Sequence, residues 1–210
     1  MPSRFFVTGT DTGVGKTVVC ALLCAALDAI YWKPIQTGAG DGTDRNTVMK
    51  LAKLPLARTI PEVYCFAPPV SPHLAARIAK VPIELKKISV PEVTAHENLI
   101  VEGAGGALVP ISPRQFMTDL MGHLKLPVLL VSRTALGTIN HTLLSLAALR
   151  AARLKIRGVI MVGTRNSENL KAIERYGHIE VLGTLPPLKE INRATLLEAF
   201  RRHFGSRIAP

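Results

Sequence analysis

A glycine-rich segment near the N-terminus contains the residues best suited to chemistry. It reads Gly9-Thr10-Asp11-Thr12-Gly13-Val14-Gly15-Lys16-Thr17, between an apolar run and an apolar helical pattern. Glycines let backbone N–H groups turn inward around phosphate oxygens, and a helix N-terminus attracts the same anions. The ending is that of a P-loop, so we expect Lys16 to contact the β- and γ-phosphates of a nucleotide and Thr17 to bind Mg²⁺. Because Thr10 stands where the standard spacing has glycine, the loop is a variant.

A carboxylate stands at the end of a second buried strand pattern. The apolar run Leu99-Ile100-Val101 leads into Glu102 and a glycine-rich turn. P-loop proteins commonly add an acidic residue at the end of a neighbouring strand to their Mg²⁺ site. We therefore expect Glu102 to meet the metal or the phosphates; the alternative is an ordinary surface glutamate.

Short β-rich runs alternate with helical patterns along the chain. The predicted strands are Arg4–Thr8, Ile30–Lys33, Leu99–Glu102, Val128–Ser132, Val159–Val162 and Glu180–Leu182. The predicted helices are Lys16–Asp28, Asp44–Leu54, Pro72–Ala79, Phe116–His123, Thr138–Arg153, Glu168–Tyr176 and Asn192–Phe204. This alternation predicts an α/β fold of the P-loop NTPase kind, a mostly parallel sheet flanked by helices on both faces, in one domain over residues 1–210. Ligands of such folds bind beyond the carboxyl ends of the strands.

The segment from Pro55 to Pro91 is the least regular part of the chain. It holds seven prolines. We expect it to be an excursion over the sheet edge rather than a second domain.

The charge balance favours anionic partners. The chain has 26 basic and 15 acidic residues, a net charge of +11. Nucleic acid is one interpretation and a small phosphate-rich substrate is the other. Because basic residues form no long run and aromatic residues are only 5%, we expect small-molecule substrates and no nucleic-acid partner. The longest apolar stretch, Val18 to Leu27, is about half of a membrane span, so we expect no membrane partner.

The cysteines bear on the compartment. Cys20, Cys24 and Cys65 show neither a CxxC pair nor zinc-type spacing. Unpaired cysteines and the lack of a secretory pattern predict a cytoplasmic protein.

Six segments in this order resemble the dethiobiotin synthetase family, whose members use ATP to close the ureido ring in biotin synthesis. Besides the P-loop they are Lys33-Pro34-Ile35-Gln36-Thr37-Gly38, Ser71-Pro72-His73, Val101-Glu102-Gly103-Ala104-Gly105-Gly106, Leu136-Gly137-Thr138-Ile139-Asn140-His141 and Gly183-Thr184-Leu185-Pro186-Pro187. The P-loop alone indicates only a nucleotide. The lysine-proline, glutamate-glycine and asparagine-histidine segments in this order are specific.

The resemblance implies a reaction of 7,8-diaminopelargonate with CO2 and ATP. One amino group takes up CO2 as a carbamate, and a carbamate oxygen attacks the γ-phosphate to give a carbamic–phosphoric anhydride. The second amine displaces phosphate and closes the ring, so that dethiobiotin, ADP and phosphate are formed. The protein then chiefly positions the reactants and stabilises charge.

The resemblance also implies roles for residues. Lys33 and Lys16 take the catalytic positions, and Thr17, Asp44 and Glu102 bind Mg²⁺. The nucleotide and metal site comprises Thr12, Gly13, Val14, Gly15, Lys16, Thr17, Val18, Asp44, Glu102, Gly103, Ala104, Gly105, Val162, Gly163, Pro186, Pro187, Leu188 and Glu190. The diamine site comprises Thr12, Lys33, Thr37, Gly105, Gly137, Thr138, Ile139 and Asn140.

A homodimer is implied as well. In the family the carboxylate tail of the diamine lies across the interface, where backbone N–H groups at a helix start receive it. Gly137 to Asn140 match that helix start. Asn140 could instead cap or pack the helix.

Two positions leave alternatives open. Asp41 could replace Asp44 at the metal site, since the spacing after Thr37 is not fixed, and either aspartate could be a helix N-cap. Better-known members of the family read adenine with an Asn-Asp pair where this chain has Val162-Gly163, although Asn166 lies nearby. We therefore predict weaker discrimination between ATP and other nucleoside triphosphates.

Two other function classes agree less well with the sequence. Partitioning and cell-division-site ATPases carry a lysine five residues before the main P-loop lysine, where this chain has Asp11. An amidotransferase-type synthetase would normally include a glutaminase section, for which 210 residues leave no room.

Overall fold

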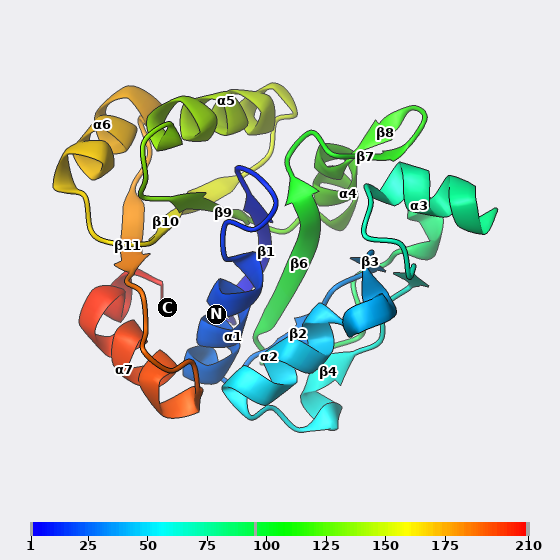
Figure 1. The fold of residues 1–210 in the computed structure, drawn as a ribbon, viewed down its shortest axis with the longest axis horizontal. Coiled ribbons are helices and arrows are strands. Elements are labelled where there is room, and N and C mark those ends of the chain that lie inside the picture. Colours follow the sequence, from blue (N-terminus) through cyan, green and yellow to red (C-terminus); the bar gives the residue numbers. More distant parts are fainter. Residues whose placement is uncertain (1, 95, 209–210) are drawn as a thin grey trace.

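A parallel sheet forms the centre of the molecule. The computed structural model describes residues 2–94 and 96–208. Seven strands follow the order β11-β10-β9-β1-β6-β2-β4, and all neighbouring pairs are parallel (Figure 1). Their bounds are β1 (Arg4–Gly9), β2 (Ile30–Trp32), β4 (Thr59–Ile60), β6 (Leu99–Gly106), β9 (Val128–Arg133), β10 (Ile156–Val162) and β11 (Val181–Leu185). The predicted parallel α/β fold is confirmed.

Helices cover both faces of this sheet (Figure 1). On one face lie α1 (Lys16–Leu27), α2 (Asp44–Ala52) and α7 (Arg193–His203). On the other lie α4 (Met117–Leu124), α5 (Thr138–Ala151) and α6 (Ser167–Gly177). Within β1, Phe5 and Val7 pack on the α1 side, while Phe6 packs on the α4 side. Because both faces are buried, the strands read as continuous apolar runs.

The segment from Pro55 to Pro91 contributes to the sheet edge. Its strand β4 pairs with β2 at the end of the sheet. A separate two-stranded sheet joins β3 (Ile35–Gln36) to β5 (Tyr64–Cys65), and α3 (Pro72–Ala79) follows. An antiparallel hairpin of β7 (Pro110–Ser112) and β8 (Gln115–Phe116) packs near α3. Strands β3, β4, β5, β7 and β8 were not predicted, because these segments of two or three residues do not stand out as apolar runs or as alternating patterns.

Some of the connections contain short 3-10 helices: η1 (Ala39–Asp41), η2 (Leu56–Arg58), η3 (Leu85–Lys87) and η4 (Gly205–Arg207). No helix in the described residues is long and apolar enough to cross a membrane.

Six helices end in an unusual backbone conformation. At or just beyond the C-terminal ends of α1 to α6, non-glycine residues adopt φ between 44° and 56°: Asp28, Lys53, Lys80, Lys125, Arg153 and His178. This left-handed region is where helices commonly end, although glycine usually occupies it. Four of the six residues are lysine or arginine, whose charge interacts favourably with the negative end of the helix dipole.

Candidate active site

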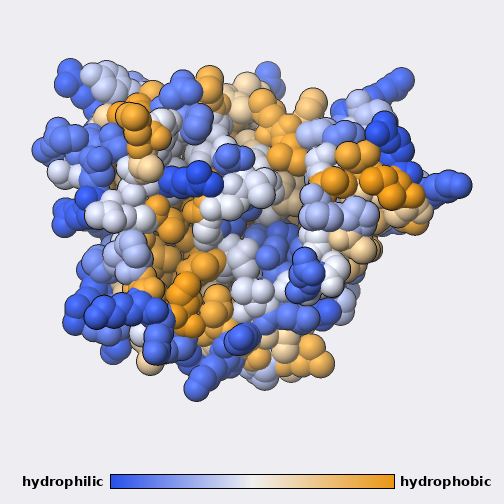
Figure 2. Space-filling model, in the orientation of Figure 1, coloured by the Kyte–Doolittle hydropathy of each residue, from blue (hydrophilic) through white to orange (hydrophobic). Residues whose placement is uncertain are grey.

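A cleft of about 570 Å³ lies at the carboxyl ends of β1, β2 and β6. Figure 2 shows hydrophilic side chains gathered in the middle of this face, with hydrophobic groups on either side. The lining combines the P-loop, residues after β2, and the end of β6: Thr12, Gly13, Gly15, Lys16, Thr17, Val18, Lys33, Thr37, Gly38, Asp44, Pro69, Val70, Ser71, Pro72, Glu102, Ala104, Gly105 and Val109. The cleft therefore collects residues from the first four of the six segments that resemble the family.

The P-loop backbone depends on its glycines. Gly15 is the N-cap of α1 with φ +98°, a conformation that residues with side chains rarely adopt. A Cβ at Gly9 would lie 2.7 Å from Val14 Cγ2 and 2.9 Å from the Asp11 carbonyl oxygen. Gly9 is thus required by close packing within the loop, which explains why glycine stands one position earlier than in the standard motif.

Lys16 is buried at the start of α1. Its ammonium donates a hydrogen bond to the Asp11 carbonyl oxygen at 2.9 Å. Burial lowers the pKa of Lys16, and the charge of Lys33 lowers it further, against the opposing effect of Glu102. The loop therefore holds a desolvated positive charge that an anionic ligand would stabilise.

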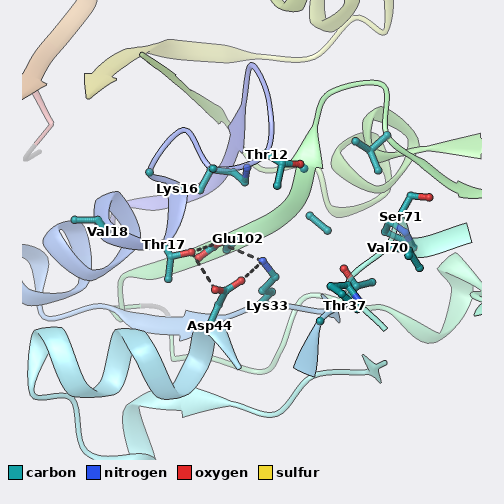
Figure 3. Close-up of a pocket in the computed structure, with 18 residues that line it drawn as sticks. Thr12, Lys16, Thr17, Val18, Lys33, Thr37, Asp44, Val70, Ser71 and Glu102 are labelled. Atoms are coloured by element: carbon teal, nitrogen blue, oxygen red, sulfur yellow. Dashed lines mark hydrogen bonds and ion pairs between the residues drawn. The ribbon is translucent and has the colours of Figure 1, made fainter. Parts of the chain in front are cut away.

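Four side chains meet at the centre of the cleft (Figure 3). Lys33 Nζ lies 2.5 Å from Asp44 Oδ2 and 3.2 Å from Glu102 Oε1. Thr17 Oγ1 lies 2.9 Å from Glu102 Oε1 and 3.2 Å from Asp44 Oδ1. Lys33 is 5% exposed and Glu102 is 1% exposed. The structure thus brings Lys33, Thr17, Asp44 and Glu102 together as one polar cluster, in which Lys33 and Glu102 are buried and Thr17 and Asp44 are half-buried.

The charge state of Lys33 follows from this cluster. Burial acts to lower the pKa of Lys33, but the carboxylates of Glu102 and Asp44, and the hydrogen bonds to them, outweigh burial and raise the pKa above its usual value. Lys33 is therefore a protonated cation throughout the physiological range.

Asp44, and not Asp41, reaches this cluster. Asp44 is the first residue of α2, and the N-cap is Thr43, whose side chain accepts from the Asn46 N–H at 3.2 Å. Asp41 is exposed in η1. The geometry favours Asp44 over Asp41 as the candidate metal ligand, because the N-terminus of α2 places Asp44 beside Lys33 and Thr17.

Two residues that sequence reasoning missed complete the cluster. Tyr31 donates from its hydroxyl to Glu102 Oε2 at 2.9 Å. Gln36 accepts from the Asp44 N–H through Oε1 at 3.1 Å, and its Nε2 donates to the Thr37 carbonyl oxygen at 2.6 Å. Tyr31 could have been found from strand alternation, because it pairs with Ile100 and shares a face with Glu102 two residues on.

The donor set suits Mg²⁺. Mg²⁺ prefers oxygen ligands and usually takes one or two carboxylates together with substrate phosphates and water. The hydroxyl of Thr17, beside the P-loop, lies within hydrogen-bonding distance of the carboxylates of both Asp44 and Glu102. Within residues 2–94 and 96–208, no group of three His, Cys, Asp or Glu side chains forms a separate metal cluster.

The expected base site is partly separate from the cleft. Val162 borders the P-loop, since a Cβ on Gly15 would lie 3.1 Å from Val162 Cγ1. Gly163 has φ +134°, and a Cβ there would lie 2.3 Å from Thr134 Oγ1. Pro186, Leu188 and Glu190 line another cleft, of about 410 Å³, against α7, and Pro187 is exposed.

The residues expected to receive the diamine tail lie outside the cleft. Gly137 is the N-cap of α5, and Thr138, Ile139 and Asn140 form its first turn. Thr138 is buried and donates to the Arg133 carbonyl oxygen at 2.5 Å, while Asn140 is exposed. Leu136, just before this turn, is fully exposed. In a single chain these four residues do not line the space around Lys33 and Thr37.

Comparisons with known proteins match this chain over nearly its whole length. The family model described as an AAA domain matches residues 3–195. The ATP-dependent dethiobiotin synthetase BioD of Rhodopseudomonas palustris (strain HaA2) is 47% identical over 98% of this chain and 96% of its own. The enzyme of the same name from Nitrobacter hamburgensis is 48% identical over the same shares.

Solved structures support the fold alone. A ParA family ATPase from Chlorobium tepidum TLS matches with a TM-score of 0.56 at 13% identity, over 100% of this chain and 94% of its own. The MinC:MinD complex of Aquifex aeolicus matches with a TM-score of 0.54 at 15% identity, over 94% of this chain and 86% of that chain.

Proposed function

The chain belongs to the family of ATP-dependent dethiobiotin synthetases, and from this premise we propose how its residues carry the reaction. It is a ligase that uses ATP to form dethiobiotin in biotin biosynthesis. The observation that carries the residue assignment is the buried contact of Lys33 with Asp44 and Glu102 beside the P-loop. The substrate is 7,8-diaminopelargonate, which takes up CO2 and then reacts at the γ-phosphate of ATP.

The P-loop holds the triphosphate in this proposal. Backbone N–H groups of Thr12 to Thr17 surround the phosphates, and Lys16 contacts the β- and γ-phosphates. The desolvated charge of Lys16 supports this role, because its pKa is lowered by burial and an anion beside it would relieve that cost. Val18 and the segment Gly103 to Gly105 complete the nucleotide site.

Thr17, Asp44 and Glu102 would hold Mg²⁺, which supplies positive charge at the β- and γ-phosphate oxygens when bound. The hard oxygen donors of Asp44 and Glu102, both within hydrogen-bonding distance of the Thr17 hydroxyl, support this assignment. Tyr31 fixes the orientation of the Glu102 carboxylate by its hydrogen bond to Oε2, the oxygen that Thr17 and Lys33 do not contact.

Lys33 stabilises the charge that develops between the carbamate and the γ-phosphate. Its raised pKa makes it a fixed cation and a hydrogen-bond donor, not a base. Thr37 and Thr12 position the amino and carbamate end of the diamine, with the backbone of Gly105. Proximity then allows the carbamate oxygen to attack the γ-phosphorus, with ADP as the leaving group. The second amine then attacks the carbamate carbon, releases phosphate and closes the ring.

We further propose that the active form is a homodimer of single-domain subunits. Gly137, Thr138, Ile139 and Asn140 lie outside the cleft of their own chain, beside the exposed Leu136. They would receive the substrate carboxylate from the cleft of a second subunit, at the N-terminus of α5, where the first backbone N–H groups and the positive end of the helix dipole favour an anion.

Mixing two inactive variants tests the shared site. Lys33→Ala removes the cation, and Asn140→Asp places a negative charge where the substrate carboxylate is expected. If the site is shared, subunit exchange creates hybrid dimers with one intact site, and about a quarter of wild-type activity should return. No recovery after demonstrated subunit exchange would contradict the proposal.

The reaction itself is tested by incubation with diaminopelargonate, bicarbonate, Mg²⁺ and ATP. We expect a ureido product and phosphate in equal amounts. ATP turnover that is independent of the diamine would contradict the proposed reaction.

The base site and the compartment are also part of the proposal. Val162, Gly163, Pro186, Pro187, Leu188 and Glu190 would flank the base. Val162 and Gly163 offer it no side-chain amide, so other nucleoside triphosphates would be accepted beside ATP. Three free cysteines support a reducing, cytoplasmic environment.

A further inference from the structure

The side chain of Gln36 connects two parts of the site to which different roles are proposed. It lies between Asp44, at the start of α2, and Thr37, which lines the cleft. Gln36 itself is 4% exposed and does not line the cleft. A buried amide in this position acts on ligands only through its two neighbours.

The orientation of the Gln36 amide is fixed by its partners. The Asp44 N–H can only donate, and the Thr37 carbonyl can only accept. Oε1 must therefore face Asp44, at 3.1 Å, and Nε2 must face Thr37, at 2.6 Å. Only an uncharged amide supplies both an acceptor and a donor here, so an ionised glutamate would lose one of the two contacts.

The backbone around Gln36 fixes the position of its side chain, whose two hydrogen bonds, to Asp44 and Thr37, are here called the Gln36 bridge. Gln36 pairs with Cys65 between β3 and β5, and its carbonyl accepts from the Phe66 N–H at 2.9 Å. After Thr37 the chain turns at Gly38, with φ +71°. Because the small sheet fixes the Gln36 backbone, the hydrogen bonds of its side chain can in turn fix the positions of Asp44 and Thr37.

The Gln36 bridge supplies a hydrogen-bond acceptor for a backbone N–H at the start of α2 that has no partner within the helix. The first N–H groups of a helix have no partner within it. In α2, Thr43 caps the Asn46 N–H, while Gln36 takes the Asp44 N–H. This second contact fixes the residue whose carboxylate lies 2.5 Å from Lys33 and 3.2 Å from Thr17.

We propose that Gln36 is a positioning residue that sets Asp44 for the metal and Thr37 for the diamine at the same time. The proposal rests on the roles given above to Asp44 and Thr37. The consequence is that one substitution, outside the P-loop, weakens the binding of Mg²⁺ and of the diamine and leaves the binding of ATP unaffected.

The test compares Gln36→Met with matched controls in diamine-dependent turnover. We expect Gln36→Met to raise both the half-saturating Mg²⁺ concentration and the diamine KM about fivefold. The reason is that Asp44 and Thr37 each lose one hydrogen bond to the Gln36 amide. The KM of ATP at saturating Mg²⁺ should stay within about twofold, because the P-loop contacts are unchanged.

Two control variants separate positioning from stability. Thr43→Ala removes a cap from the same end of α2 and should lower the melting temperature without moving either constant. Gln115→Met makes the same chemical change at the chain's other glutamine, in β8, and should leave both constants unchanged; the Gln115 side chain accepts a hydrogen bond from Ser112. If Gln36→Met moves neither constant, or Thr43→Ala moves both equally, the inference is overturned.

Further variants keep the result interpretable. If Gln36→Met does not fold, Gln36→Asn is used; its amide is one methylene shorter and cannot reach both partners, so an unchanged Mg²⁺ and diamine dependence would also overturn the inference. Asp44→Asn and Thr37→Val test the underlying roles. If these two leave both constants unchanged, the proposed site fails and the inference with it; if they change the constants and Gln36→Met does not, only the inference fails.

Discussion

Replacing Lys33 by alanine is the most informative single perturbation of this site. Lys33 Nζ lies 2.5 Å from Asp44 and 3.2 Å from the nearly inaccessible Glu102. At an effective dielectric constant of about 20, unit charges 3.2 Å apart attract by about 5 kcal/mol before desolvation is counted. Removing one partner of a buried pair typically costs about 3 to 5 kcal/mol. Glu102 keeps its hydrogen bonds from Thr17 and Tyr31, so we expect about 3 kcal/mol.

The loss of stability should be visible in thermal unfolding. For a chain of this size, about 3 kcal/mol corresponds to roughly 6 to 12 °C in the melting temperature. Lys33→Met serves as the control for volume, because it fills the same space without charge. The raised pKa of Lys33 sets the pH window. Its stabilisation is fully present below the unfolded-state pKa and is lost only as pH rises through the higher folded-state pKa, so the difference between wild type and Lys33→Met should stay constant from about pH 7 to 10.

Lys33→Ala should lower the rate of dethiobiotin formation more than it changes the affinity for nucleotide. A preorganised donor at developing charge commonly contributes a factor of about 100 to 1000 in rate. We expect Lys33→Ala to lose this factor in dethiobiotin formation, measured at saturating substrates. Mg²⁺-ADP should bind at least as tightly, since Lys33 no longer pairs with the carboxylates proposed to hold the metal. A rate within tenfold of wild type, or a melting temperature lowered by less than about 2 °C, would refute this reasoning.

Three more predictions concern the nucleotide. Lys16→Met should stabilise the nucleotide-free protein in chemical denaturation while weakening ATP binding; as pH rises from the lowered pKa of Lys16 toward its usual value, wild type should gain stability that the variant lacks. Gly15→Ala should destabilise by about 1 to 2 kcal/mol and raise the KM of ATP, because φ is +98° and the new methyl group would press on Val162; an unchanged denaturation midpoint would argue against the loop geometry. CTP and GTP should compete with ATP at comparable concentrations in the turnover assay, and a strong preference for ATP would show that the base is read by other groups.

The sequence specified the main sheet because its strands are buried on both faces. Six of the seven strands and all seven α-helices are apolar runs or periodic segments long enough to recognise. The edge strand β4 was missed, since its two residues, Thr59 and Ile60, carry no pattern and are defined only by pairing with β2.

Motif residues of the site were predictable where a local rule names them. Lys16, Thr17 and Glu102 follow from the phosphate loop and from a carboxylate at a strand end. Whether Asp41 or Asp44 joins them depends on where α2 begins and which way it points, which the sequence left open. Gln36 lies in the lysine-proline segment, but the sequence assigned it no role, because the role proposed for it consists of two contacts with backbone atoms that only the folded turn brings together.

The basic residues that end the helices change how the net charge of +11 should be interpreted. Left-handed backbone costs a residue with a side chain about 1 to 2 kcal/mol. At Lys53, Lys80, Lys125 and Arg153, attraction to the helix dipole offsets part of this cost. Added salt screens that attraction but leaves the steric cost in place. Part of the positive charge therefore serves folding rather than ligand capture, and moderate ionic strength should loosen the helix ends while leaving the buried cluster around Lys33 unaffected.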